Sequence, residues 1–111
     1  MSEAKLRPAA PSDRDVCGRI LYDAFKYSAD AHNFRRDFPN REVALLVMDS
    51  LLELRWGVVA EIDGRVVGSN FVERGDCVDG IGPVSVHPSL QQSGVGRRLM
   101  QAVVEYGQRS E

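Results

Sequence analysis

The fold of this chain is decided by residues 81–97, which read IGPVSVHPSLQQSGVGR. A short apolar strand pattern ends at His87-Pro88, a glycine-containing loop follows, and an amphipathic helix begins near Gly94. Gly94 and Gly96 lack the Cβ atoms that would keep another molecule away from the backbone. Consecutive N–H groups at the start of the helix can therefore point at one anion, and the helix dipole adds partial positive charge there. The stretch predicts a phosphate-binding loop.

Glycines at this spacing also occur in other kinds of loop. A Rossmann dinucleotide site requires a third glycine three residues after Gly96, where Leu99 stands instead. A Walker loop requires Gly-Lys-Ser or Gly-Lys-Thr, and neither follows. A plain turn stays open, with Ser93 capping the helix and Gly94 supplying an unusual dihedral angle.

The spacing Gln91-x-x-Gly94-x-Gly96, after a Val-x-Val strand, resembles the acyl-CoA signature of the GNAT superfamily of N-acetyltransferases, written Q/R-x-x-G-x-G/A. The resemblance implies an α+β fold with a mixed sheet and flanking helices, and acetyl-CoA as the acyl donor. It also implies that the loop amides hold the pyrophosphate, while the strand lends backbone groups to the pantetheine arm. Mapped by motif, the implied cofactor-binding residues are Val84, Ser85, Val86, Gln91, Gln92, Ser93, Gly94, Val95, Gly96 and Arg97.

Hydrophobic periodicity and turn residues predict the other elements of the chain. They are a strand at 5–7, a helix over 13–27 capped by Ser12, a loop over 30–39, a helix from a cap at Asn40 to about 55, strands on both sides of Asp63-Gly64, a strand near 78–87 and a helix over 94–108. This order matches the first part of the GNAT plan, so residues 1–111 are expected to form a single GNAT-like domain. We expect Trp56 to serve in packing.

A complete GNAT domain continues past this helix into a strand parallel to the fourth, whereas this sequence ends at Glu111. The domain is therefore expected to be incomplete at its C-terminus, without the tyrosine that many relatives use there as a general acid. The fourth strand would present unpaired N–H and C=O groups along one edge. We expect either a homo-oligomer, such as a dimer, formed through this edge, or a chain cut from a longer protein.

Composition excludes several other classes of protein. The 111 residues are 43% hydrophobic and 27% charged, as in an ordinary globular domain, and the net charge of −2 gives no basic field for nucleic acid. The longest strongly apolar stretch, 43–48, is too short to span a bilayer, so no membrane association and a cytoplasmic location are expected. Cys17 and Cys77 lie far apart and form neither a redox pair nor a zinc cluster, which predicts free thiols and no metal.

The resemblance implies direct transfer, in which a substrate amine loses a proton and attacks the thioester. A carboxylate near the fourth strand would accept that proton, and Glu73, Asp76 and Asp79 are the candidates, although for each of them a solvated loop acid is the better interpretation. In the family the region between the first two helices lines the acceptor pocket. The candidate substrate contacts are His32, Phe34, Asp37 and Phe38, of which the two phenylalanines can instead anchor the loop on the core.

Two functions follow. The first is an acetyl-CoA-dependent N-acetyltransferase, or the cofactor-binding portion of one, that acts on a primary amine of a small molecule or a protein. The second is a non-catalytic relative of the family that binds CoA or associates with itself.

Overall fold

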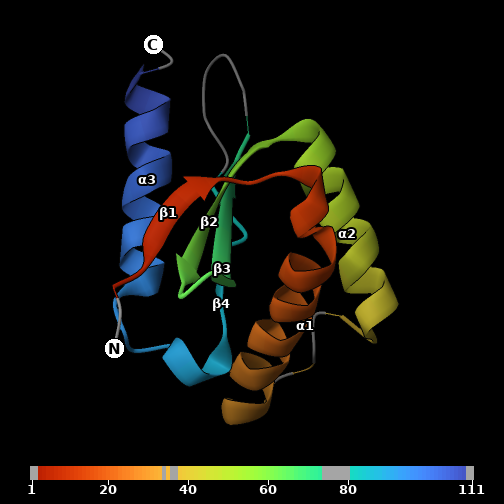
Figure 1. The fold of residues 1–111 in the computed structure, drawn as a ribbon. Coiled ribbons are helices and arrows are strands. Elements are labelled where there is room, and N and C mark those ends of the chain that lie inside the picture. Colours follow the sequence, from red (N-terminus) through yellow and green to blue (C-terminus); the bar gives the residue numbers. More distant parts are fainter. Residues whose placement is uncertain (1–2, 34, 36–37, 74–80, 110–111) are drawn as a thin grey trace.

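A computed structural model describes residues 3–33, 35, 38–73 and 81–109 (Figure 1). Four strands form one sheet in the order β1-β2-β3-β4, and every neighbouring pair is antiparallel. Helices α1 and α2 cover one face of the sheet and α3 covers the other (Figure 1). The elements are β1 (Lys5–Pro8), η1 (Pro11–Asp13), α1 (Arg14–Ala31), α2 (Arg41–Leu54), β2 (Trp56–Ile62), β3 (Arg65–Val72), β4 (Ser85–Val86), η2 (Pro88–Leu90) and α3 (Val95–Arg109).

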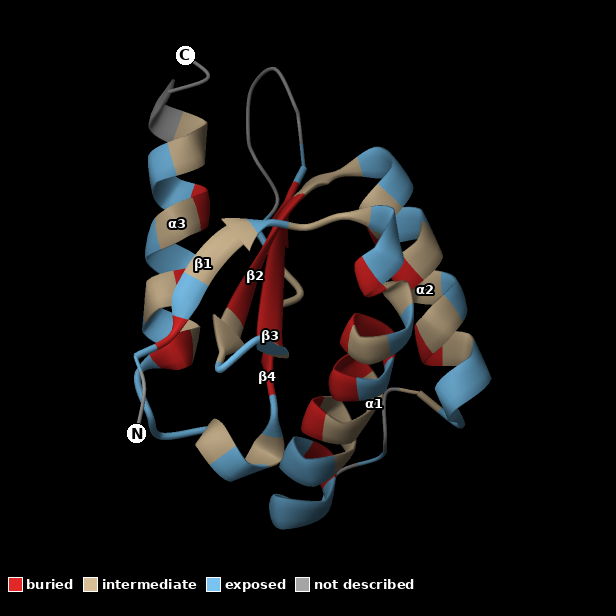
Figure 2. Ribbon diagram, viewed as in Figure 1, coloured by how far each residue is buried: buried red, intermediate tan, exposed pale blue. Residues whose placement is uncertain are grey.

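Most residues of β3 and the middle of β2 are buried (Figure 2), and the side chains of these strands enter hydrophobic clusters on both faces of the sheet. Successive residues of a strand point to opposite faces. Val59 of β2 accordingly packs with Leu21 of α1 and Met48 of α2, whereas its neighbour Val58 packs with Leu99 of α3. The two hydrophobic clusters confirm the expected α+β class, and the described strands supply the antiparallel part of the expected mixed sheet.

Helix α2 and the β2–β3 hairpin follow their sequence signals. The side chain of Asn40 accepts a hydrogen bond of 3.0 Å from the Val43 N–H, as a helix cap does. Asp63 and Gly64 both have positive φ, at 52° and 79°, which is the conformation of the tight turn that suits the twist of a hairpin. Both predictions are confirmed.

The predicted limits of the first helix were wrong at both ends. Ser12 lies inside η1 and does not cap α1; the turn is closed instead by Asp13, whose carboxylate accepts the Ala10 N–H at 2.8 Å. The helix also continues to Ala31, through residues expected to be loop. It ends where Asn33 adopts a φ of 59°, a left-handed conformation that asparagine tolerates.

The strand expected near 78–87 is shorter than predicted. Strand β4 consists of Ser85–Val86, and Ile81 makes a separate antiparallel bridge to Val72. Between them stands Pro83, which has no N–H to donate to a sheet. Residues 74–80 lie outside the described part.

Within the described ranges, no helix is both long and apolar enough to cross a membrane.

Candidate functional site

The loop between β4 and α3 is held in shape by hydrogen bonds within itself. The N–H of Leu90 bonds the His87 carbonyl at 2.8 Å, and the N–H and hydroxyl of Ser93 bond the Leu90 carbonyl at 3.1 and 2.7 Å. Gly94 then has a φ of +91°, which favours glycine. His87 has a structural role in this loop, because its Nδ1 accepts the Ser89 N–H at 3.2 Å.

Helix α3 begins with backbone donors aimed out of the helix. Its first helical bond runs from the Arg98 N–H to the Gly94 carbonyl at 3.2 Å. The N–H groups of Gly96 and Arg97 have no acceptor within the described part of the chain. A Cβ built on Gly96 would have as its nearest neighbour Val86 Cγ2, at 3.6 Å, so the space beside this glycine is open. These donors, together with the helix dipole, suit an anion.

Strand β4 offers backbone groups on the side away from β3. The His87 N–H bonds the Val67 carbonyl at 2.8 Å, and Ser85 pairs with Ser69. Because hydrogen bonding alternates along an antiparallel pair, the backbones of Val84 and Val86 face the other way. The outward carbonyl of Val86 accepts a hydrogen bond of 2.7 Å from Gln91 Nε2.

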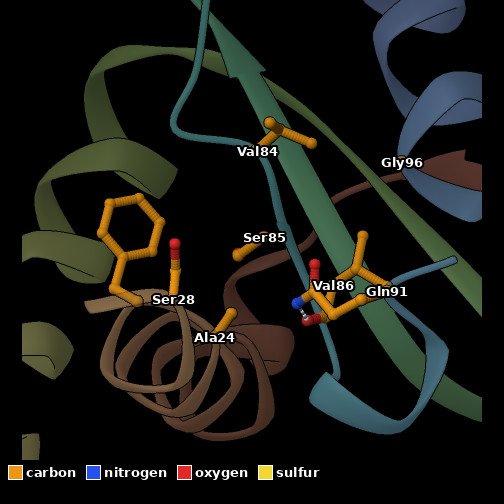
Figure 3. A pocket seen from close by; sticks show the side chains of 8 residues that line it. Ala24, Ser28, Val84, Ser85, Val86, Gln91 and Gly96 are labelled. Carbon is orange, nitrogen blue, oxygen red and sulfur yellow. Dashed lines mark hydrogen bonds between the residues drawn. The ribbon is translucent and has the colours of Figure 1, made fainter. Parts of the chain in front are cut away.

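A cavity of about 370 Å³ opens between α1, β4 and this loop (Figure 3). The structure brings five of the predicted cofactor residues onto its wall: Val84, Ser85, Val86, Gln91 and Gly96. The other predicted residues do not line it, and the Val95 side chain is buried in the α3 side of the core. The other predicted cofactor residues that do not line the cavity are Gln92, Ser93, Gly94 and Arg97.

The opposite wall of the cavity is the last half of α1, which contributes Ala24, Phe25 and Ser28. The sequence motif does not indicate these three residues as part of the site, since Ala24 belongs to an apolar row of α1 that is typical of a core face. Ser28 follows Ala24 by four residues on the same helix face, and a polar residue continuing an apolar row was the signal available. In Figure 3 the side chains of Ala24, Ser28 and Ser85 project into the space between α1 and β4.

None of the acceptor candidates in the described part of the chain lines this cavity. His32 is exposed at the C-terminal end of α1. The ring of Phe38 packs on Phe25, with centroids 5.6 Å apart, and so supports the cavity wall from behind. Phe34 and Asp37 fall outside the described part of the chain.

Of the predicted bases, Glu73 lies in the described part of the chain, and it does not line the cavity. Glu73 is exposed at the end of β3, and Asp76 and Asp79 fall outside the described residues. No carboxylate of the described ranges lines the cavity. Nor do His, Cys, Asp and Glu side chains of those ranges form a group of three that could hold a metal ion.

Two buried hydroxyls meet at the wall of the cavity, to which Ser85 contributes. Ser85 Oγ is 3.3 Å from Ser69 Oγ, and both side chains are buried. Cys17, also buried, lies next to Ser69, and burial raises the pKa of this thiol to about 12. The thiol therefore stays protonated at neutral pH and is not a nucleophile.

A protein-family model described as an acetyltransferase (GNAT) domain matches residues 55–111, just over half of the chain. The chain belongs to the GNAT acetyltransferase family. The matched region contains β2, β3, β4, the loop and α3, whereas the α1 wall of the cavity lies outside it. A search of the curated proteins found no match to this chain.

Solved structures share the fold. A GNAT family acetyltransferase from Brucella melitensis, in complex with acetyl-CoA, matches 97% of this chain and 70% of its own at a TM-score of 0.77 and 23% identity. A putative acetyltransferase from Pyrococcus horikoshii matches 96% of this chain but only 35% of its own length, at a TM-score of 0.80 and 23% identity. The paia N-acetyltransferase from Thermoplasma acidophilum, in complex with coenzyme A, matches 98% of this chain and 74% of its own length, at a TM-score of 0.81 and 11% identity. These similarities confirm the GNAT fold.

Proposed function

We propose that this chain is an acetyl-CoA-dependent N-acetyltransferase, or the cofactor-binding part of one, that acetylates a primary amine. The observation that carries the proposal is the continuity of one cavity. The outward backbone of β4 and the beginning of α3, where Gly96 stands, line the same space of about 370 Å³. Membership of the GNAT family and the acetyl-CoA and CoA complexes of two structural neighbours support the same function.

The residues present fit acetyl-CoA. The N–H groups of Gly96 and Arg97 would hold the pyrophosphate, since both point out of the helix without an acceptor in the described ranges. The backbone of Val84 and the N–H of Val86 would pair with the amides of the pantetheine arm, since the Val86 carbonyl already accepts a hydrogen bond from Gln91. When bound, the thioester supplies an activated acetyl group for attack by the amine. The implied cofactor-binding roles of Ser85, Gln92, Ser93, Gly94 and Val95 are part of this proposal. Gln91, whose side-chain amide already bonds the Val86 carbonyl, belongs to the site through the shape of the loop.

The proposal also includes a proton acceptor and a pocket for the amine. A carboxylate at the end of β3 or in the following loop would take the proton of the amine, and the candidates are Glu73, Asp76 and Asp79. His32, Phe34, Asp37 and Phe38 would lie on the acceptor side. The acceptor itself is a primary amine of a small molecule or a protein, and the cytoplasmic location stays a prediction.

Calorimetric titration of the purified chain with CoA tests the proposal. We expect CoA to bind with a dissociation constant in the micromolar range, which corresponds to a binding free energy of about −8 kcal/mol. Pantetheine lacks the pyrophosphate, so we expect it to bind at least about tenfold more weakly. Release of free CoA thiol from acetyl-CoA in the presence of a panel of amines then tests transfer. A folded chain that binds neither ligand would overturn the proposal.

The open edge of β4 favours a second candidate, a non-catalytic protein that associates with itself. The outward backbone of Val84 and Val86 could pair with a strand of a second copy. Light scattering over a range of protein concentrations tests this function. A dimer that forms without any CoA affinity would favour it, and a monomer that binds CoA would exclude it.

A further inference from the structure

We propose that Gln91 is a positioning residue, whose side-chain amide fastens the phosphate loop to β4 before any ligand arrives. This inference rests on the proposed function, since the loop is the pyrophosphate site of that function. It assigns Gln91 a role different from direct contact with the cofactor, which the signature alone would suggest.

The bond that carries the inference joins the loop to the strand. Gln91 Nε2 donates to the Val86 carbonyl at 2.7 Å, across five residues of sequence (Figure 3). A carbonyl oxygen only accepts, so the amide nitrogen must face it and the amide oxygen points elsewhere. The Gln91 side chain is therefore committed to the protein in the absence of a ligand.

The same bond supplies what the rest of the loop lacks. The contacts of Leu90 and Ser93 run to residues of the loop itself or to His87 beside it. Among the described residues, the Gln91 bond is the hydrogen bond that ties residues 88–94 to β4. The carbonyl that it uses would otherwise be an unpaired acceptor on the strand edge, and an unpaired backbone group is unfavourable when partly buried.

The consequence concerns the donors at the start of α3. The loop leads directly into Gly96 and Arg97, so its distance from β4 sets where their N–H groups lie relative to the strand. A site that is ordered before binding loses less entropy when its ligand binds. Fastening at Gln91 therefore raises affinity for a pyrophosphate without contacting it.

The first arm of the test uses the ligand-free chain. Gln91→Leu keeps the size of the side chain and removes the donor, and Gln91→Arg supplies another donor that can reach a carbonyl. Gln101→Leu is the matched control, because Gln101 is an exposed glutamine of α3 that does not line the cavity. Amide hydrogen exchange is followed at Ser93 and Arg98, whose N–H groups are bonded within the loop and at the helix start, with Val103 as the reference. We expect Gln91→Leu to speed exchange at Ser93 and Arg98 about 2- to 10-fold and to leave Val103 unchanged, as loss of one hydrogen bond predicts.

The second arm measures CoA affinity of the same variants by calorimetry. We expect weaker binding by Gln91→Leu, recovery in Gln91→Arg, and parental binding by Gln101→Leu. Weaker binding with unchanged exchange in the ligand-free chain would overturn the inference, because Gln91 would then act on the ligand directly. Faster exchange with unchanged affinity would also overturn it. If the parent binds no CoA, the proposed function fails, whereas the exchange rates still show whether Gln91 fastens the loop.

Discussion

The indole of Trp56 lies flat against the ring of Tyr106, with centroids 4.0 Å apart and planes inclined by 7°. Trp56 is the first residue of β2 and Tyr106 lies near the end of α3, so the stack fastens the far end of this helix to the sheet. The other end of α3 adjoins the loop that follows β4. Anchoring α3 through its core face and through this stack keeps that beginning in register with β4.

Removing the stacked ring is predicted to destabilise the fold. Tyr106→Ala should lower the free energy of unfolding by about 1–3 kcal/mol, from lost apolar burial and lost ring contact. Urea unfolding followed by fluorescence checks this, because Trp56 is the single tryptophan. Tyr27 is 53% exposed, so Tyr27→Ala should change the stability by less than about 0.5 kcal/mol. Equal losses in the two variants would contradict the prediction.

The ion pair of Arg7 with Asp13 predicts acid sensitivity. Arg7 donates to both carboxylate oxygens of Asp13, at 2.8 and 2.9 Å, and also bonds Glu61. Because Arg7 bonds it, the pKa of the buried Asp13 carboxyl lies below its usual value of 3.8. A depressed pKa contributes stability above the unfolded value, and that stability is lost as the pH falls through the folded value.

Arg7→Met should therefore cost about 1–3 kcal/mol at pH 7, since it leaves Asp13 without its partner. The gap in unfolding free energy between parent and variant should narrow as the pH falls from about 5 toward 3. Urea titrations at several pH values measure that gap. Arg65→Met, at an exposed position, is the control and should show no such trend. A gap for Arg7→Met that stays constant down to pH 3 would refute the assignment.

The buried thiol predicts the opposite dependence on pH. Burial raises the pKa of Cys17 from 9.0 to about 12, so its contribution is complete below pH 9 and is lost as the pH rises toward 12. Variants in a Cys77→Ser background leave Cys17 as the single thiol. The stability difference between Cys77→Ser and Cys17→Ala/Cys77→Ser should be about 1–2 kcal/mol smaller at pH 10.5 than at pH 8. A thiol reagent that modifies the folded chain rapidly at pH 8 would show that Cys17 is accessible after all.

Local signals made much of the fold predictable. Asn40 caps α2 through a bond three residues away, and Asp63-Gly64 closes the hairpin through its own two dihedral angles. Such interactions lie within a few residues, so their residue types suffice to recognise them. The loop and the start of α3 were predictable for the same reason.

Contacts between distant residues were not predictable in this way. The α1 wall of the cavity depends on how α1 lies across the sheet beside β4, and no pattern within α1 encodes that placement. The last turn of α1 forms although Asp30 and the polar residues after it suggested a loop, because Ala29 is buried there. The bond from Gln91 to Val86 also escaped, because it depends on which carbonyls of β4 face away from β3.

Gly94 and Gly96 are predicted to respond differently to a methyl group. Gly94 has a φ of +91°, so Gly94→Ala should cost about 1–3 kcal/mol of stability through backbone strain. Gly96 lies in α3 with its nearest added-Cβ contact at 3.6 Å, so Gly96→Ala should leave stability unchanged or raise it by up to about 1 kcal/mol. Urea unfolding of the two variants measures both effects. Equal costs at the two positions would show that the loop does not need a left-handed residue at Gly94.

At Gly96 the size of the side chain should then separate binding from folding. Gly96→Ala is the matched control, and we expect its CoA affinity to stay within about threefold of the parent, because one methyl group fits beside Val86. Gly96→Leu fills the space in front of the Gly96 and Arg97 N–H groups, so we expect CoA binding at least about tenfold weaker, a loss of 1.4 kcal/mol or more. Calorimetry gives the affinities, and circular dichroism confirms that both variants are folded. Parental CoA affinity in a folded Gly96→Leu chain would show that the pyrophosphate does not approach this backbone, and the phosphate-binding role of the loop would have to be abandoned.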